Sequence, residues 1–183
     1  MNKYEEIIKT EKFKSTNRIW NEKHLNAISK VGPMMKIVRD CKSIAIFENE
    51  YFKKYHGLDR INEAARELKR ACAAEGIELT DQEAIDYAYI RIVYQTWQGH
   101  KRELEVIDMF KTYSNLAVFQ STYEEDVKYA IDAKVYKDGH LLFGLQIKPM
   151  SYKNYYSQQH KINKEKNELF KKDFRREVIY IYI

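Results

Sequence analysis

Hydrophobic and polar residues alternate over residues 128–136, which predicts a β-strand. Apolar side chains occupy every second position there: Tyr129, Ile131, Ala133 and Val135. A second apolar run covers residues 141–147, and the sequence Lys-Asp-Gly-His at 137–140 between the two runs is typical of a tight turn. The two runs and the turn therefore predict a β-hairpin.

Apolar patterns elsewhere downstream of residue 90 predict two helices and two more strands. The helices are expected at about 94–113 and 154–172, and the strands at about 116–121 and 177–183. With the hairpin, these elements follow the order α-β-β-β-α-β. We therefore expect an α/β (α+β mixed) core over residues 91–183.

Residues 1–90 show a helical pattern and are expected to form an N-terminal helical region. The expected breaks between its helices are these: Gly32-Pro33, Gly57, Gly76 and Gly99. Thr80 and Glu83 have the spacing of a capping box, which predicts that a helix over residues 84–96 begins there. Gly99 is expected to separate that helix from the next one.

Three polar residues of the hairpin could act together if they share one face of the sheet: Asp132, Gln146 and Lys148. Loop length decides the face, because a one-residue change in register turns every side chain over. A two-residue turn would place Asp132 opposite Leu145 and away from the other two. A three-residue loop, with Gly139 as a left-handed bulge, places Asp132 opposite Gly144 with Gln146 as its diagonal neighbour. We expect the three-residue loop.

Asp132 followed by Gln146-x-Lys148 resembles the signature of the PD-(D/E)xK nucleases, the shared core of most type II restriction endonucleases and many repair nucleases. Ile131 stands where the signature has Pro, and Gln146 stands where it has Asp or Glu, so one ligand charge is missing. The element order is also that of this family. The segment from Leu145 to Tyr152 further resembles the MjaI-like restriction endonucleases.

This resemblance implies hydrolysis of phosphodiester bonds in double-stranded DNA with Mg²⁺, for which Mn²⁺ can substitute. Because Mg²⁺ prefers oxygen ligands, Asp132 would supply a carboxylate, Gln146 an amide oxygen and Ile147 its backbone carbonyl. Lys148 would orient the attacking water and stabilise charge on the phosphate. A single formal charge binds Mg²⁺ weakly, so a further carboxylate is expected.

The helix before the sheet offers that carboxylate. Glu103 shares a helix face with Val106, Ile107 and Phe110, the expected inward stripe, and we assign it to the catalytic and metal site. Glu105 lies about 200° around the helix and is expected to meet solvent. The alternatives for Glu103 are an acid near the helix N-terminus, favoured by the macrodipole, and an ion pair with Lys101 or Arg102. The acids at 124–126 are expected to lie in a solvated loop, and the alternative is that they hold a second metal.

Basic residues concentrate beside the proposed catalytic lysine. Residues 148–183 contain nine Lys and Arg against four Asp and Glu, whereas the rest of the chain balances at 23 against 23. Such a surface suits a phosphate backbone, although basic helices are also often only solvated. The residues expected to contact DNA are Lys128, Lys134, Ser151, Tyr152, Lys153, Tyr155, Gln158 and Lys161.

Composition and motifs exclude a disulfide framework, a zinc site with regular ligand spacing, a membrane-spanning helix and the common nucleotide-binding and serine-hydrolase motifs. The 183 residues contain only two cysteines, five scattered histidines and no run of eighteen apolar residues. No Walker loop, no G-x-S-x-G elbow and no Rossmann fingerprint is present. We expect no membrane association and a cytoplasmic location, in a bacterial, archaeal or phage-infected cell.

The sequence thus predicts a type II restriction-type endonuclease. A homodimer is expected, because twofold symmetry matches palindromic DNA, and a cognate DNA methyltransferase is a possible functional partner. Residues 1–90 would cap the core, form a dimer interface or contact DNA. The alternatives are a repair, recombination or phage DNA-processing nuclease with the same core, a non-catalytic DNA-binding module, and a helical protein–protein module.

Overall fold

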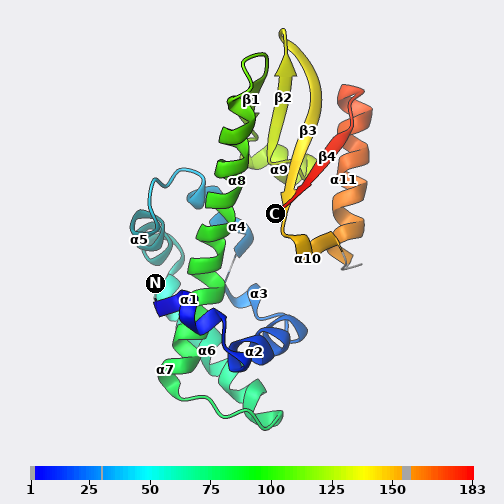
Figure 1. Ribbon diagram of the computed structural model, residues 1–183. Coiled ribbons are helices and arrows are strands. Elements are labelled where there is room, and N and C mark those ends of the chain that lie inside the picture. The colour runs from blue at the N-terminus through cyan, green and yellow to red at the C-terminus, as the bar shows by residue number, and fades with distance from the viewer. Residues whose placement is uncertain (1–2, 30, 154–157) are drawn as a thin grey trace. The chain divides into compact units, whose positions relative to one another are not determined.

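The computed structural model describes residues 3–29, 31–153 and 158–183 (Figure 1). The chain divides into two compact units, residues 1–100 and 101–183. The first is helical and the second contains a sheet with helices, so the predicted mixed α/β fold is confirmed. No helix among the described residues combines the length and the apolar character needed to cross a membrane.

The first unit is built from short helices, a π-helical turn and the start of α8. In chain order these elements are α1 (Lys3–Ile8), α2 (Glu11–Glu22), α3 (Asn26–Ser29), α4 (Val31–Val38), α5 (Ile44–Tyr55), α6 (Gly57–Ala74), α7 (Asp81–Tyr89), η1 (Ile90–Tyr94) and α8 (Gln95–Lys111). Their apolar faces meet in one core, whose largest fully buried side chains include Trp20, Phe47 and Tyr51.

The predicted helix boundaries in this unit are confirmed at Gly57, where α6 begins, at Gly76, which follows it, and at the Thr80–Glu83 capping box. The predicted separation at Gly99 is wrong, because α7 continues through η1 into α8 and Gly99 lies inside α8. A glycine inside a helix costs only about 0.5–1 kcal/mol, which the surrounding helical residues offset.

The second unit begins within α8 and contains a four-stranded sheet among its described residues. Its elements are β1 (Ala117–Gln120), α9 (Tyr123–Tyr129), β2 (Ala133–Lys137), β3 (His140–Lys148), α10 (Met150–Lys153), α11 (Gln158–Phe174) and β4 (Val178–Tyr182). The strand order is β1-β2-β3-β4, with the first three strands antiparallel and β3 parallel to β4. The predicted order α-β-β-β-α-β is present, with α9 and α10 added to it.

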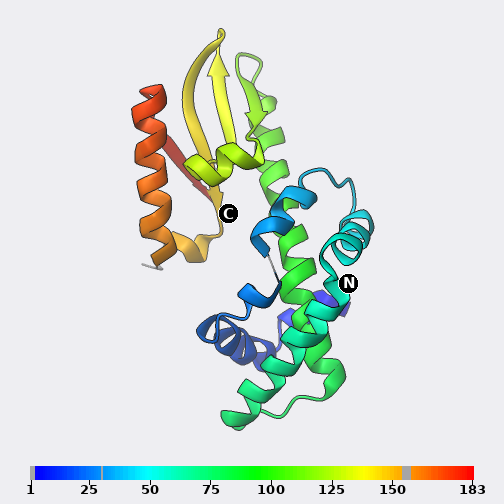
Figure 2. The ribbon, with the colours of Figure 1, turned by 180° about the vertical axis from the view of Figure 1, so that it is seen from behind.

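A helix covers each face of this sheet (Figures 1 and 2). On one face, Val106 and Ile107 of α8 pack against the alternate residues of the hairpin: Ala133, Val135, Leu145 and Ile147. On the other face, Phe170 of α11 packs with Tyr129 and Ile131. Gly144 permits this approach, because a Cβ there would lie 3.0 Å from Ile131 and 3.1 Å from the Phe170 ring.

The hairpin differs from the prediction in its turn. Lys137 pairs with His140, so the loop has two residues, and Asp138 and Gly139 both adopt positive φ angles, 50° and 77°. The three-residue loop was therefore wrong. Further along, Tyr136 pairs with Leu141 but Val135 pairs with Phe143, which leaves Leu142 as an extra residue in β3. Because of this bulge, Ala133 pairs with Leu145, so the next positions along the two strands are Asp132 and Gln146. These two residues therefore share a face of the sheet, as the prediction required.

The predicted strand also begins too early. Lys128 and Tyr129 belong to α9, and Ala130 ends that helix in the left-handed conformation with φ of 53°. Thr122 and Glu125 form a second capping box, and the acids at 124–126 follow it, where negative charge favours a helix N-terminus. These local signals outweigh the alternation over 128–132, and the predicted solvated loop at 124–126 is a helix.

Candidate active site

Asp132 lies where β2 begins and its backbone joins three parts of the sheet. Its N–H donates to the Leu145 carbonyl at 2.7 Å, and its carbonyl accepts from the Ser121 N–H at 2.9 Å. Its carboxylate oxygen Oδ2 accepts from the Ile147 N–H at 2.6 Å. The side chain thus supplies a hydrogen bond to the backbone of β3 just before β2 begins, which fixes the position of the carboxylate.

The surroundings of Asp132 oppose its negative charge. The side chain is buried, and the pKa of its carboxyl is raised to about 7. Burial is the largest cause and the negative charge of Glu103 is the next, while the Lys148 ammonium and the Ile147 N–H act in the opposite direction. A buried carboxyl with a raised pKa favours binding of a nearby cation, because the cation would stabilise its charged form.

Gln146 is buried two residues before Lys148 on β3, and its Oε1 atom has no hydrogen-bond partner among the described residues. A buried oxygen without a partner costs about 1–3 kcal/mol. Lys148 is half-buried on the same face of the strand, and β3 ends there before Pro149. The structure therefore leaves one buried oxygen acceptor without a described partner on the strand next to Asp132.

Glu103 and Glu105 occupy the positions expected from the helix pattern. Glu103 is half-buried on the stripe that carries Val106 and Ile107, and its charge acts on Asp132. Glu105 is exposed, and the Lys101 ammonium lies 3.6 Å from it. Lys101 therefore pairs with Glu105, and Glu103 is the carboxylate of α8 that acts on Asp132.

The oxygen atoms at this site suit a small divalent cation. They are the carboxylates of Asp132 and Glu103 and the unsatisfied amide oxygen of Gln146, and hard cations such as Mg²⁺ prefer such oxygen ligands. Within the described ranges, no group of three or more His, Cys, Asp or Glu side chains could hold a metal ion. Any cation here would depend on the amide as well as on the two acids.

The residues predicted to contact DNA fall into three groups. Lys128 and Lys134 form ion pairs, with Asp173 at 3.0 Å and with Glu125 at 2.5 Å. Tyr152 and Lys161 have accessible side chains on α10 and α11. The other predicted contacts lie outside the described residues or have side chains outside them: Ser151, Lys153, Tyr155 and Gln158. Contact with DNA stays a prediction for all of them.

Sequence reasoning missed Asn167 and the tyrosines of β4. The Asn167 Nδ2 group donates to the carbonyls of Tyr129 and Ala130, at 2.9 and 3.2 Å, and its Oδ1 accepts from the Tyr180 hydroxyl at 2.5 Å. Asn167 thereby holds the turn that leads into Asp132. The spacing of Tyr180 and Tyr182, two residues apart on a strand, was the available signal, because it puts both on one face.

The chain was compared with known proteins and protein families. A family model described as MjaI restriction endonuclease matches residues 15–183. Comparisons with curated proteins and with solved structures found no match. The family match spans the helical unit as well as the sheet, and it includes Glu103, Asp132, Gln146 and Lys148. The chain therefore belongs to the MjaI restriction endonuclease family.

Proposed function

We propose that this protein hydrolyses phosphodiester bonds at specific sites in double-stranded DNA in a Mg²⁺-dependent reaction. The observation that carries the proposal is the unsatisfied Oε1 atom of buried Gln146 beside the Asp132 carboxylate, whose pKa is raised to about 7. The Gln146 oxygen has no described partner and burial disfavours the charged form of Asp132, so a bound cation would stabilise both groups. Membership of a restriction endonuclease family supports DNA as the substrate.

Asp132, Gln146 and Glu103 would hold the Mg²⁺, with the backbone carbonyl of Ile147 as a further oxygen ligand. When bound, Mg²⁺ would neutralise charge on the phosphate and lower the pKa of a coordinated water. Mn²⁺, which accepts the same oxygen ligands, is the expected substitute.

Lys148 would act on the water and on the phosphate. Its ammonium lies close enough to Asp132 to lower the pKa of that carboxyl. A cation in this position can hold the attacking water by hydrogen bonding and stabilise the negative charge that grows on the phosphate oxygens. The Asp132 carboxylate, fixed by the Ile147 N–H, would keep the ligands aligned during the reaction.

The partners follow from the nature of restriction. Cutting both strands at one site requires two active sites, so the proposal includes a homodimer with twofold symmetry. A cell that makes the enzyme must protect its own sites, so the proposal also includes a cognate DNA methyltransferase as a functional partner.

The decisive experiment is digestion of long unmethylated DNA by the full chain with Mg²⁺, with EDTA as the metal-free control. Lys148→Ala should abolish cleavage. Lys137→Ala, which removes an exposed lysine at the other end of the hairpin, is the matched control and should leave cleavage unchanged.

Each result of the digestion has one meaning. Discrete metal-dependent bands, lost only in Lys148→Ala, support a site-specific endonuclease. A smear would instead indicate a repair, recombination or phage DNA-processing nuclease of the same core. DNA binding without cleavage in either Mg²⁺ or Mn²⁺ would overturn the catalytic proposal and leave a DNA-binding module.

A further inference from the structure

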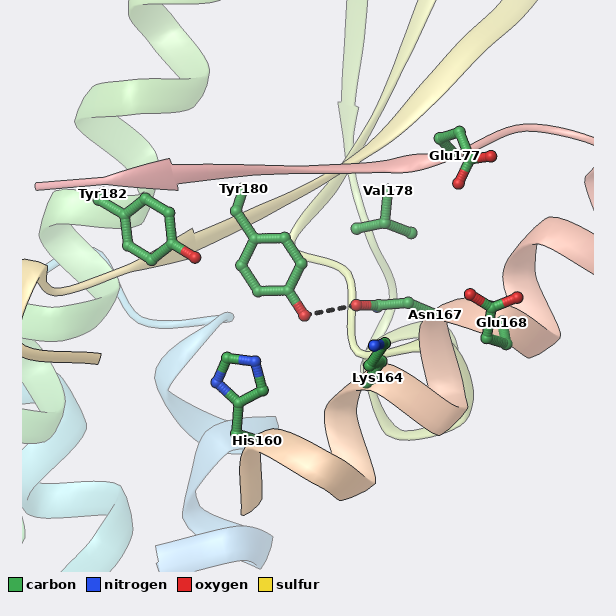
Figure 3. A pocket seen from close by; sticks show the side chains of 8 residues that line it. All are labelled: His160, Lys164, Asn167, Glu168, Glu177, Val178, Tyr180 and Tyr182. Atoms are coloured by element: carbon green, nitrogen blue, oxygen red, sulfur yellow. Dashed lines mark hydrogen bonds between the residues drawn. The ribbon is translucent and has the colours of Figure 1, made fainter. Parts of the chain in front are cut away.

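A pocket of about 240 Å³ lies between α11 and β4 (Figure 3). Tyr180 and Tyr182 project into it from the strand, and His160 and Lys164 project from the helix. Asn167, Glu168, Glu177 and Val178 complete the wall. One end of the pocket is therefore aromatic and basic, while the other end carries two carboxylates.

The rings of His160, Tyr180 and Tyr182 line the aromatic end, and the nearly parallel ring of Tyr152 lies beside them. Tyr152 stacks on His160 with ring centroids 5.0 Å apart and an interplanar angle of 12°. It lies at 18° to Tyr180, which in turn lies at 20° to Tyr182. All four side chains are only partly buried. Aromatic rings that line a pocket can stack on another flat π-system that enters it.

The sheet register places this surface next to the proposed metal site. Tyr180 pairs with Gln146 across β3 and β4, and Tyr182 pairs with Lys148. Paired residues of parallel strands point to the same face, so each tyrosine neighbours one residue of the proposed catalytic set. The Asp132 charge also acts on Tyr180, whose pKa is raised to about 12, mainly by burial.

A hydrogen-bond network joins the pocket to the carboxylate. The Tyr180 hydroxyl donates to Asn167, and Asn167 holds the carbonyls of Tyr129 and Ala130 just before Asp132 in the chain. Because its hydroxyl is engaged in this bond, the Tyr180 ring is held in place. The pocket wall is thus ordered by the same residue that orders the active-site turn.

We propose that this pocket binds an unstacked base of the DNA strand, next to the phosphate held at Lys148. The inference rests on the proposed nuclease function for its substrate. A base has the flat π-face that stacked rings recognise, and stacking on aromatic side chains is the usual way proteins bind bases outside a duplex. The Lys164 ammonium would contact the adjoining phosphate, and the Glu168 carboxylate can accept from an amino group of a base.

The test compares single strands with and without bases. The full chain, in EDTA so that no cleavage occurs, is titrated against a labelled mixed-sequence strand of about ten nucleotides, within the usual site size. The second probe is an abasic strand of equal length and charge, and binding is measured by fluorescence anisotropy. The wild-type protein should bind the strand with bases about tenfold more tightly, because stacking on one base contributes that much.

Tyr182→Leu should remove this preference while leaving the affinity for the abasic strand unchanged. Tyr113→Leu, at an exposed tyrosine outside the pocket, is the matched control and should keep the preference. His160→Leu provides a second pocket variant with the same expected result, should Tyr182→Leu fail to fold. Lys164→Ala should weaken binding of both strands equally.

The proposal is overturned if the wild type shows no preference for bases, or if both pocket variants retain it. The outcome is separable from that of the nuclease test. If Tyr182→Leu loses the preference and the wild type cuts no DNA, the base-binding proposal stands and the nuclease proposal is overturned. Metal-dependent cleavage by the wild type, with the preference unchanged in both variants, would do the reverse.

Discussion

The two units of this chain differ in how their buried apolar and polar side chains are arranged. Residues 1–100 bury their apolar side chains in one continuous core, whereas residues 101–183 divide a smaller set between the two faces of a sheet. In the first unit, buried Thr16 donates to carbonyls of its own helix at 2.8 and 2.9 Å. In the second unit, buried Gln146 keeps an oxygen without a described partner. Two buried polar groups therefore differ, because the fold satisfies the Thr16 hydroxyl and leaves the Gln146 oxygen without a described partner.

The largest expected effect is on catalysis, from Asp132→Asn. The change keeps the shape of the side chain and an acceptor for the Ile147 N–H, but removes the ligand charge. Cleavage of duplex DNA at saturating Mg²⁺ should fall by at least about a thousandfold. Asp108→Asn, at an exposed acid of α8, is the control and should cut normally. Near-normal rates in Asp132→Asn would remove this residue from the site.

Large-to-small substitutions in the two cores should differ in their effect on catalysis. Phe47→Ala in the first and Phe170→Ala in the second each leave a cavity at a fully buried ring, and each should cost about 3–5 kcal/mol in urea unfolding. Phe170→Ala should also lower kcat, because that ring packs beside Ile131 and against Gly144, next to Asp132.

The milder variant Phe170→Leu tests the same idea with less loss of stability. Rates are to be compared at a temperature where every variant is folded. An equal loss of kcat in Phe47→Ala would contradict the division between a core for stability and a core that supports the site.

The metal-free protein should lose stability as pH rises. The folded chain binds the Asp132 proton more tightly than the unfolded chain, because the pKa is raised from 3.8 to about 7. This stabilisation is complete below about pH 4 and is lost as pH rises to about 7, at a cost of a few kcal/mol. Urea unfolding in EDTA across this range measures it.

The same measurement on Asp132→Asn should show a weaker dependence on pH and a higher stability at pH 8 than the wild type. Saturating Mg²⁺ should reduce the difference by stabilising the charged carboxylate in the wild type. A wild-type profile that matches the variant at every pH would show that the Asp132 pKa is not raised.

Gln146→Glu should tighten the metal site. It supplies the acid that the family signature carries at this position, and an added ligand charge should strengthen Mg²⁺ binding about tenfold in calorimetry. The metal-free variant should be less stable at pH 8, because it buries a second carboxylate beside Asp132. Gln120→Glu, on β1, is the control and should change neither quantity. Unchanged Mg²⁺ affinity would place the cation elsewhere.

The smallest effect is expected at the two capping boxes. Thr80→Ala and Thr122→Ala each remove one helix cap and should cost about 1 kcal/mol in thermal unfolding. Only Thr122→Ala should also slow cleavage, because α9 ends at the turn that leads into Asp132. Identical kinetics for the two variants would show that α9 does not help to position the carboxylate.

The sequence predicted the order of elements in the second unit because its strands are short, apolar and separated by turn residues. It also predicted that Glu103 lies on the inward face of α8, since a helix face can be counted from positions alone. It did not predict α9, where a capping box and three acids outweigh an alternating pattern that extends into a helix. Nor did it predict the contacts of Asn167 and Tyr180, because these join residues that only the folded chain brings together.

The turn of the hairpin shows another limit of local reasoning. Asp138 and Gly139 form the two-residue turn that their residue types favour. Asp132 and Gln146 can share a face only if one extra residue lies between them, and the prediction placed that extra residue in the loop. The extra residue lies instead in β3, where no residue type in the sequence predicts a bulge.

The bulge at Leu142 has a consequence for comparing relatives of this chain. Thirteen residues separate Asp132 from Gln146, an odd count that a regular two-residue hairpin cannot contain while keeping both on one face. A relative with one residue fewer would need no bulge, and its acid and amide would still meet. Sequence alignments should therefore place such a gap at Leu142 and leave Asp138-Gly139 aligned. A single-residue deletion here would change the twist of a strand and preserve the chemistry.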